Sequence, residues 1–240
     1  ADTYNYTVGY GSYSASTDSF AFDRDGEFYV LKGEEPSEYG ITSSKYDEKI
    51  SFDESENVIG IAIDLKTNTF YTYYGMQGSL TIKKYPNLIS KGTLAGAETV
   101  SGVDVDGLNI YYDSAKIAIY DGVVYILTRT DYDSGDYVLG WYNTADSSKE
   151  NINLSENEVT SSLLSSDSSA KITDMHYQNG AVYMLVRDVS DENFYEGDSP
   201  SLYSRGAVLK VNPASREIKA LGFSKDSKTN EDLKNNWIWL

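Results

Sequence analysis

The sequence predicts an all-β fold of about four antiparallel four-stranded sheets, and three observations carry this prediction. Short apolar runs rich in β-branched and aromatic residues recur along the 240 residues. Four of the runs follow a turn dipeptide at a fixed distance, and no segment sustains a helical period of 3.6 residues. Composition shifts nowhere enough to mark a boundary, so we expect residues 1–240 to form a single domain.

The repeat is anchored on four tyrosines with a shared local pattern: Tyr29, Tyr71, Tyr125 and Tyr183. The two residues four and three positions before them are Asp-Gly, Thr-Asn, Asp-Gly and Asn-Gly, in that order. Asp-Gly and Asn-Gly favour two-residue type I′ turns, because both central residues then need a positive φ. Apolar runs flank each turn, so each unit is predicted to be a β-hairpin.

The runs upstream of the turns lie at residues 20–22, 59–63, 117–119 and 172–177. They are continuous rather than alternating, which is typical of strands buried on both faces. Further strands are predicted at 79–85, 137–142 and 207–221, the last of them a second hairpin around residues 212–215. Loops are predicted at 33–45, 145–170, 188–205 and 225–236, with at most one helical turn at 157–164.

The pattern of turn dipeptide, apolar residue, Tyr, apolar residue and Leu, with a later strand such as residues 207–212, resembles the blades of bacterial β-propeller repeat proteins. The resemblance covers residues 18–223 and implies a β-propeller-like array, while the second repeat departs from it in the turn Thr67-Asn68. A closed four-bladed ring, a piece of a larger ring and half of a ring completed by a second chain all remain open. The chain also resembles uncharacterised surface lipoproteins of spirochaetes, a family that implies export and a lipid anchor and has no known activity.

The net charge of the chain limits which kinds of partner it can bind. Lys and Arg number 20 against 37 Asp and Glu, a net charge of −17. Nucleic acid is therefore not expected as a partner, and cations, basic proteins or neutral ligands are favoured. No cysteine is present, which excludes disulfides and cysteine nucleophiles. No run approaches the roughly 20 apolar residues of a membrane span.

The chain starts at Ala1 without an initiator methionine. This fits an exported protein from which a secretory signal, or a lipoprotein signal with its anchor cysteine, has been removed. We therefore expect an extracytoplasmic location, in the periplasm or at the cell surface, with a lipid anchor in a full-length lipoprotein form.

Tyrosine is unusually frequent, with 22 residues in the chain. The densest group outside the repeat is the N-terminal set Tyr4, Tyr6, Tyr10 and Tyr13. A tyrosine side chain combines a large apolar face with a polar tip, which suits contacts with sugars, peptides and proteins. These four residues are the candidate binding surface, although tyrosine is also a common strand residue.

Acidic clusters suggest calcium as the only cofactor to consider. The best candidate ligands are Asp131, Asp133 and Asp136, and weaker clusters lie at residues 23–26 and 104–107. Calcium takes six to eight oxygen ligands from carboxylates and carbonyls. None of these clusters continues into an EF-hand loop with its closing glutamate, so solvated turns are the alternative interpretation.

The residues offer little for catalysis. His176 is the only histidine, with Asp174 on the same strand face but no nucleophile nearby in the sequence. Asp23 and Asp64 take similar places near the ends of inner strands, where a pair of carboxylates can hydrolyse glycosides. We therefore interpret the chain as a non-enzymatic exported protein that binds a protein or carbohydrate through loops on one rim. A hydrolase using rim carboxylates, with or without calcium, is the alternative.

The C-terminus ends in four large apolar residues, 237–240. Exposed together, they would form a patch prone to association. We expect them to pack within a sheet, either with the N-terminal segment of the same chain or with a neighbouring molecule. The second case is self-association through the C-terminal segment.

Overall fold

The computed structural model describes residues 6–7, 19–22, 28–32, 40–43, 50–51, 58–76, 79–86, 96–105, 108, 110, 115–131, 135–164, 170–188 and 206–222. These residues form β-strands and one helical turn, α2 (Ser161–Leu164). In this part of the chain no helix has the length and apolar character needed to cross a bilayer. The C-terminal residues 237–240 lie outside the described residues.

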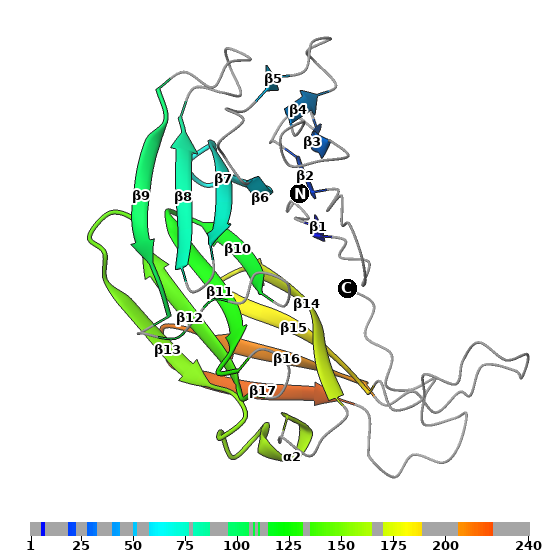
Figure 1. Cartoon of the computed structure of the whole chain (residues 1–240). Coiled ribbons are helices and arrows are strands. Elements are labelled where there is room, and N and C mark those ends of the chain that lie inside the picture. The colour runs from blue at the N-terminus through cyan, green and yellow to red at the C-terminus, as the bar shows by residue number, and fades with distance from the viewer. Residues whose placement is uncertain are drawn as a thin grey trace, which may run out of the picture. The chain divides into compact units, whose positions relative to one another are not determined.

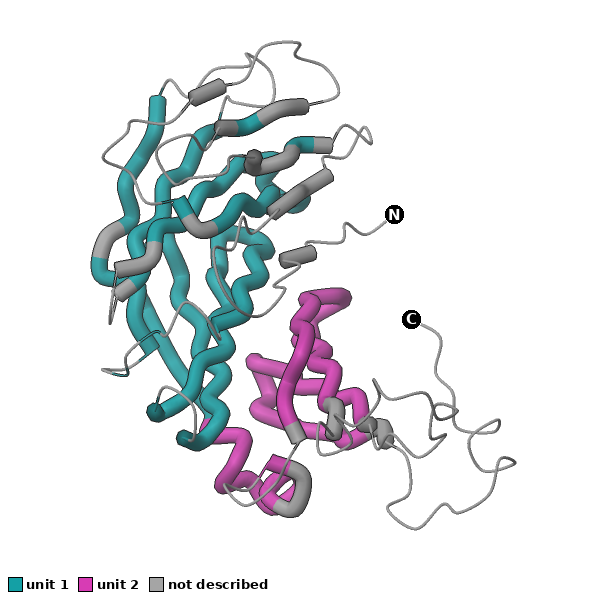
Figure 2. Tube along the Cα trace, turned by 45° about the vertical axis from the view of Figure 1, so that its right-hand side comes forward, with its two compact units in different colours: residues 1–152 teal, residues 153–240 magenta. Residues whose placement is uncertain are grey.

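The chain divides into two compact units, residues 1–152 and residues 153–240 (Figure 2). Each unit is built from antiparallel sheets in which the strands follow chain order. The prediction of one domain over residues 1–240 stays a prediction.

Unit 1 contains three sheets (Figure 1). Sheet 1 has five strands, β1 (Tyr6–Thr7), β2 (Ser19–Phe22), β3 (Phe28–Lys32), β4 (Gly40–Ser43) and β5 (Ile50–Ser51). Sheet 2 has four strands, β6 (Val58–Asp64), β7 (Thr69–Met76), β8 (Ser79–Tyr85) and β9 (Glu98–Val103). Sheet 3 has four strands, β10 (Lys116–Tyr120), β11 (Val123–Arg129), β12 (Tyr137–Asn143) and β13 (Lys149–Asn153).

Unit 2 contains sheet 4, which again has four strands in chain order. They are β14 (Ala170–Gln178), β15 (Ala181–Asp188), β16 (Gly206–Asn212) and β17 (Glu217–Gly222). A β-bulge interrupts the pairing of β14 with β15 between Ile172 and Asp174.

The four anchor tyrosines occupy equivalent positions in their sheets. Each lies on the second strand of a hairpin and faces a residue of the first strand in the same register, as follows: Tyr29 and Ala21, Tyr71 and Ala62, Tyr125 and Ala118, Tyr183 and His176. This is the equivalence that the turn dipeptides predict.

Two of the predicted hairpin turns have the backbone that their sequence favours. Asp121 and Gly122 have φ values of 51° and 74°, and Asn179 and Gly180 have φ values of 48° and 82°. Positive φ at both central residues defines the type I′ turn, which follows the twist of the flanking strands. In sheet 2 the turn is longer, residues 65–68, and only Asn68 in it has a positive φ, at 55°.

Sheets 1 and 2 pack through an aromatic core. Tyr29 of β3 is fully buried against Phe70 of β7, with ring centroids 5.4 Å apart in an edge-on arrangement. Phe70 also contacts Tyr85 of β8, with centroids 6.3 Å apart. Ile61 and Ile63 of β6 belong to the same cluster. The anchor tyrosine of sheet 1 therefore points at the face of sheet 2.

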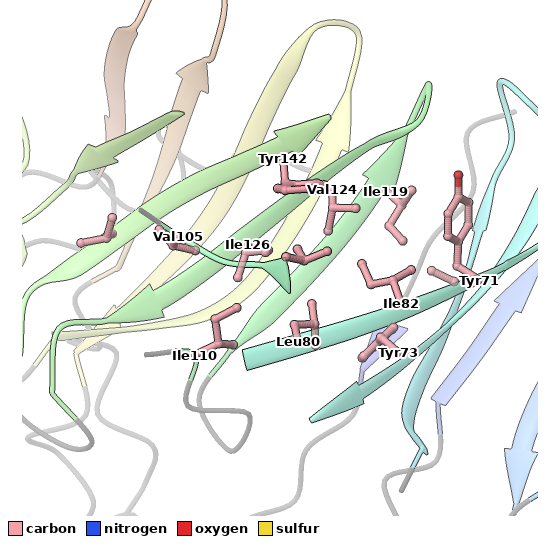
Figure 3. Packing of buried hydrophobic residues seen from close by; sticks show 13 residues of the cluster. Tyr71, Tyr73, Leu80, Ile82, Val105, Ile110, Ile119, Val124, Ile126 and Tyr142 are labelled. Carbon is pink, nitrogen blue, oxygen red and sulfur yellow. The ribbon is translucent and has the colours of Figure 1, made fainter. Parts of the chain in front are cut away.

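Sheets 2 and 3 repeat this arrangement with different residues (Figure 3). Tyr71 and Tyr73 of β7 pack with Ile119, Val124 and Ile126 of sheet 3. Sheet 2 is thus buried on both faces, as its continuous apolar runs predict.

The first strands of adjacent sheets also contact each other, β2 with β6 and β6 with β10. Face-to-face sheets with neighbouring first strands have the arrangement of successive propeller blades. The predicted fold class, a β-propeller-like array of antiparallel sheets, is confirmed, with a fifth strand added to sheet 1.

The outer strands are where the sequence prediction is wrong. Residues 33–45 and 145–170 were expected to be loops, yet they contain β4 and β13, and β9 has no counterpart in the prediction. The sequence of β13 is KENIN, and only Ile152 in it is buried. An outer strand exposed on most of its surface needs no apolar run, so its strand signal in the sequence is weak.

Candidate functional site

Asp64 is the last residue of β6, and its side chain is fully buried. Its Oδ1 accepts hydrogen bonds from the backbone N–H of Lys66 at 2.9 Å and of Thr67 at 3.3 Å. Aspartate often holds a turn in this way, by accepting from backbone groups two or three residues on. Asp64 therefore fixes the turn of its own hairpin.

The same carboxylate also holds the turn of the next sheet. The N–H of Asp121 donates to Oδ1 at 3.0 Å, and the N–H of Gly122 donates to Oδ2 at 2.7 Å. Burying a carboxylate is costly unless hydrogen-bond donors replace the lost water, and here four backbone N–H groups do so. One side chain thus ties together the hairpin turns of sheets 2 and 3.

A third turn joins this network after β12. The backbone N–H of Thr144 and its hydroxyl both donate to the carbonyl oxygen of Gly122, at 2.9 and 2.8 Å. The N–H of Ala145 donates to Oδ1 of Asn143 at 2.9 Å. Turns 65–68, 121–122 and 144–148 therefore lie together at one end of sheets 2 and 3, and we call them the Asp64 rim.

The outer surface of the Asp64 rim is polar. Its exposed residues include Lys66, Thr67, Asp121 and Asp146. Asp146 accepts from the hydroxyl of Ser148 at 2.6 Å and from the N–H of the same residue at 2.9 Å. These hydrogen bonds lower the pKa of Asp146 below its ordinary value and favour its charged form. The rim therefore presents charged and hydroxyl groups on a backbone that internal hydrogen bonds hold in place.

Tyr71 lies beneath the rim and is 2% exposed. Burial raises the pKa of its hydroxyl to about 12, and the negative charge of Asp64 adds to this effect. Hydrogen bonds with Thr144 and Thr67 act in the opposite direction and moderate the rise. The neutral phenol is therefore part of the folded state.

The raised pKa of Tyr71 predicts a loss of stability in alkali. Because the folded-state pKa of about 12 lies above the ordinary tyrosine pKa of 10.0, deprotonation favours the unfolded chain. This contribution to stability is fully present below pH 10 and is lost as the pH rises toward 12. We expect the melting temperature of the wild type to fall more steeply across this range than that of Tyr71→Phe, measured by circular dichroism. Comparison at pH 8 isolates the lost hydroxyl contacts, and equal slopes for the two proteins would contradict the prediction.

Of the four tyrosines predicted to bind a ligand, only Tyr6 lies in a described strand. Tyr4, Tyr10 and Tyr13 lie outside the described residues, and Tyr6 is in β1 without a described side chain. The candidate binding surface therefore stays a prediction.

The predicted calcium loop connects β11 and β12, at the end of sheet 3 opposite the Asp64 rim. Thr130 and Asp136 close it, since each backbone N–H donates to the other residue, at 2.9 and 2.8 Å. The guanidinium Nε of Arg129 donates to the carbonyl oxygen of Gly135 at 3.0 Å. Asp131 and Asp136 are described and Asp133 is not, so calcium at this loop stays a prediction.

The described residues bring no metal-binding group together, since no three His, Cys, Asp or Glu side chains gather among them. In the acidic cluster at residues 104–107, the carboxylate of Asp104 forms an ion pair with the ammonium group of Lys149, with the shorter N–O distance at 2.7 Å. His176 lies half-buried on β14 opposite Tyr183, and Asp174 on the same strand accepts from the N–H of Met175 at 2.8 Å.

Of the two carboxylates considered for hydrolysis, Asp23 lies outside the described residues and Asp64 is described. The structure gives Asp64 a holding role that the sequence analysis missed. The available signal was a single aspartate directly before a hairpin turn, the position from which its side chain can accept turn N–H groups.

No protein-family model matches the sequence. No curated protein matches it either.

Solved structures give distant likenesses. Hydrazine synthase of Kuenenia stuttgartiensis matches 84% of this chain and 52% of its own, at 12% identity and a TM-score of 0.47. The endosialidase of phage phi92 matches 80% of this chain and 30% of its own, at 16% identity and a TM-score of 0.38. The GH74 enzyme of Niastella koreensis matches 92% of this chain and 38% of its own, at 12% identity and a TM-score of 0.37.

The chain thus spans about half, or less, of the length of the solved structures it matches. At these TM-scores and identities, no activity is carried from them to this chain.

Proposed function

We propose that this protein is a non-enzymatic binding or scaffold protein that recognises a protein or a carbohydrate through the Asp64 rim. One observation supports this most directly: a single buried carboxylate holds two hairpin turns of adjacent sheets. The backbone of such turns loses little conformational entropy when a ligand binds, and this preorganisation favours affinity.

The same network argues against Asp64 as a catalytic acid or base. General acid–base catalysis needs a carboxyl group within hydrogen-bond reach of the substrate. The side chain of Asp64 is fully buried, and both of its oxygens accept from backbone N–H groups. The carboxylate of Asp64 therefore holds the turns of the rim and is not accessible to a substrate.

The chemistry of the rim indicates the class of ligand. Lys66, Thr67 and Asp146 offer a cation, a hydroxyl and a carboxylate, which together match the hydroxyls of a sugar or the polar groups of a peptide. The net charge of −17 favours a neutral or basic ligand over an acidic one. The proposed function requires no cofactor, and we place it outside the cytoplasm, at the cell surface or in the periplasm.

Binding to printed arrays of glycans and of purified extracellular protein domains tests the proposal. For a ligand found there, the triple variant Lys66→Ala/Thr67→Ala/Asp146→Ala is expected to weaken binding at least roughly tenfold in biolayer interferometry. Glu158→Ala is the matched control for Asp146→Ala, because both carboxylates are exposed and Glu158 lies outside the Asp64 rim. It should leave both affinity and melting temperature unchanged.

Three outcomes would overturn the proposal. They are the absence of any ligand on both arrays, a ligand whose affinity the triple variant does not change, and cleavage of a bound glycan by the wild type.

A further inference from the structure

One face of sheet 4 differs from its equivalents in the other sheets. By strand register it carries Tyr183 together with the following residues: Asp174, His176, Leu185, Val208 and Lys210. We call it the Tyr183 face. On the opposite face of the sheet, Val182, Met184 and Leu209 are at most 1% exposed.

The difference is clearest at the centre of the sheet. Two residues after the anchor tyrosine, sheets 2, 3 and 4 each have an apolar cross-strand pair: Tyr73 with Ile82, Leu127 with Leu139, and Leu185 with Val208. Tyr73 is 5% exposed and Leu127 is 1% exposed, whereas Leu185 is 46% exposed. The Tyr183 face therefore has the same kind of apolar pair as sheets 2 and 3, but Leu185 in that pair is not buried.

Within unit 1 it is the next sheet along the chain that covers the tyrosine face. Tyr29 is covered by Ile61, Ile63 and Phe70 of sheet 2. Tyr71 is covered by the residues at the same register positions of sheet 3: Ile117, Ile119 and Val124. The covering set is thus two alternate residues of the first strand plus the residue directly before the anchor tyrosine.

Sheet 1 has a covering set of its own. At the corresponding register positions its sequence has Phe20, Phe22 and Phe28, on the face opposite Tyr29. No sheet precedes sheet 1 among the described residues, just as none follows sheet 4. Sheet 4 therefore has a tyrosine face with no later described sheet to cover it, and sheet 1 has an apolar covering set with no earlier described sheet to cover.

We propose that the Tyr183 face is a docking surface for a second copy of this chain, which it meets through the Phe20, Phe22 and Phe28 positions of sheet 1 in that copy. The contact is heterologous, because different faces of the two copies meet. A second copy is the proposed occupant because its sheet 1 brings the covering set that the Tyr183 face lacks. Closure by sheet 1 of the same chain is the competing outcome that the cross-linking test separates. The inference is independent of the function proposed for the Asp64 rim.

Charge on the Tyr183 face supports this occupant. The ammonium group of Lys210 lies 5.6 Å from the centroid of the Tyr183 ring, and Lys171 and Lys219 share the face by register. The carboxylates on this face by register are Asp174 and Glu217. The face is thus locally basic on a chain with a net charge of −17, and this reduces the repulsion that a second acidic copy meets there.

Sedimentation equilibrium of the whole chain tests the association. The weight-average mass of the wild type is expected to rise with concentration, because a heterologous contact joins copies head to tail. Leu185→Glu is expected to raise the dissociation constant at least roughly 30-fold. Val159→Glu is the matched control, because Val159 is another exposed apolar residue of unit 2, at 40%. A wild type that stays a single chain up to about 100 µM, or an equal effect of the two variants, would overturn the proposal.

Disulfide cross-linking tests which faces meet, and the absence of native cysteine makes it specific. Leu185→Cys on one tagged chain and Phe28→Cys on another are expected to form a mixed disulfide, because facing Cβ atoms come within bonding range. Val30→Cys replaces Phe28→Cys should that variant not fold.

Two cross-linking results would overturn the proposal. One is a bond only between two Leu185→Cys chains, which indicates symmetric pairing. The other is a bond within a single doubly substituted chain, which indicates closure without a second copy.

Discussion

Replacing Asp64 with alanine is expected to lower the free energy of unfolding by about 3–5 kcal/mol. The substitution leaves four backbone N–H groups without their acceptor, and two of them belong to the neighbouring sheet. Hydrogen bonds to a charged acceptor are stronger than neutral ones, and buried donors that lose such a partner are costly. Urea denaturation followed by tryptophan fluorescence measures the change.

Two further variants control this prediction. Asp104→Ala also removes a carboxylate and its partner contact, but the pair with Lys149 is partly exposed, so a loss below about 1 kcal/mol is expected. Asp64→Asn keeps an oxygen for the donors at Oδ1, while its amide group faces the N–H of Gly122, so an intermediate loss is expected. A loss for Asp64→Ala no larger than that for Asp104→Ala would contradict the holding role.

Replacing Gly60 with alanine is expected to cost about 2–3 kcal/mol of stability, because an added methyl group overpacks the core. Gly60 is buried beside the bulge in β6, and a Cβ placed on it would overlap the ring of Tyr73. The ring has little room to withdraw, since Tyr73 is 5% exposed and packed in the core between sheets 2 and 3. Thermal and urea unfolding both measure this cost.

A double-mutant cycle separates the overlap from other effects of the substitution. In a Tyr73→Ala background the ring is gone, so Gly60→Ala is expected to cost less than about 0.5 kcal/mol. The coupling between the two positions is then close to the whole cost of the single variant. Strictly additive losses would show that Gly60 is needed for its backbone rather than for the space it leaves.

The hairpins of this fold are the part that the sequence predicts well. Asp121-Gly122 and Asn179-Gly180 specify their turns through local backbone preference, and the runs that flank Asp121-Gly122 are buried on both faces. The outer strands β9 and β13 lack both signals, because they are mostly polar and paired through the backbone. Their place is set by the neighbouring strand rather than by their own residues.

The candidate site is predicted less well, and Asp64 shows why. The sequence places a carboxylate at the end of an inner strand, a position that also suits a catalytic acid. Two of the donors that determine its role are 57 and 58 residues away, in the turn of another sheet. Only the packing of sheet 2 on sheet 3 brings them together, and no local pattern carries that information.

The chain-order topology of the sheets has a consequence for how such a protein folds and changes in length. Among the described strands, each sheet completes its backbone pairing within one uninterrupted stretch of chain. Contacts of this kind are short in sequence, so a sheet can form early, without waiting for distant segments to meet. Duplication or deletion of one stretch would likewise leave the ladders of the others whole. The number of repeats is then limited by whether the two terminal faces find cover, and not by backbone hydrogen bonding.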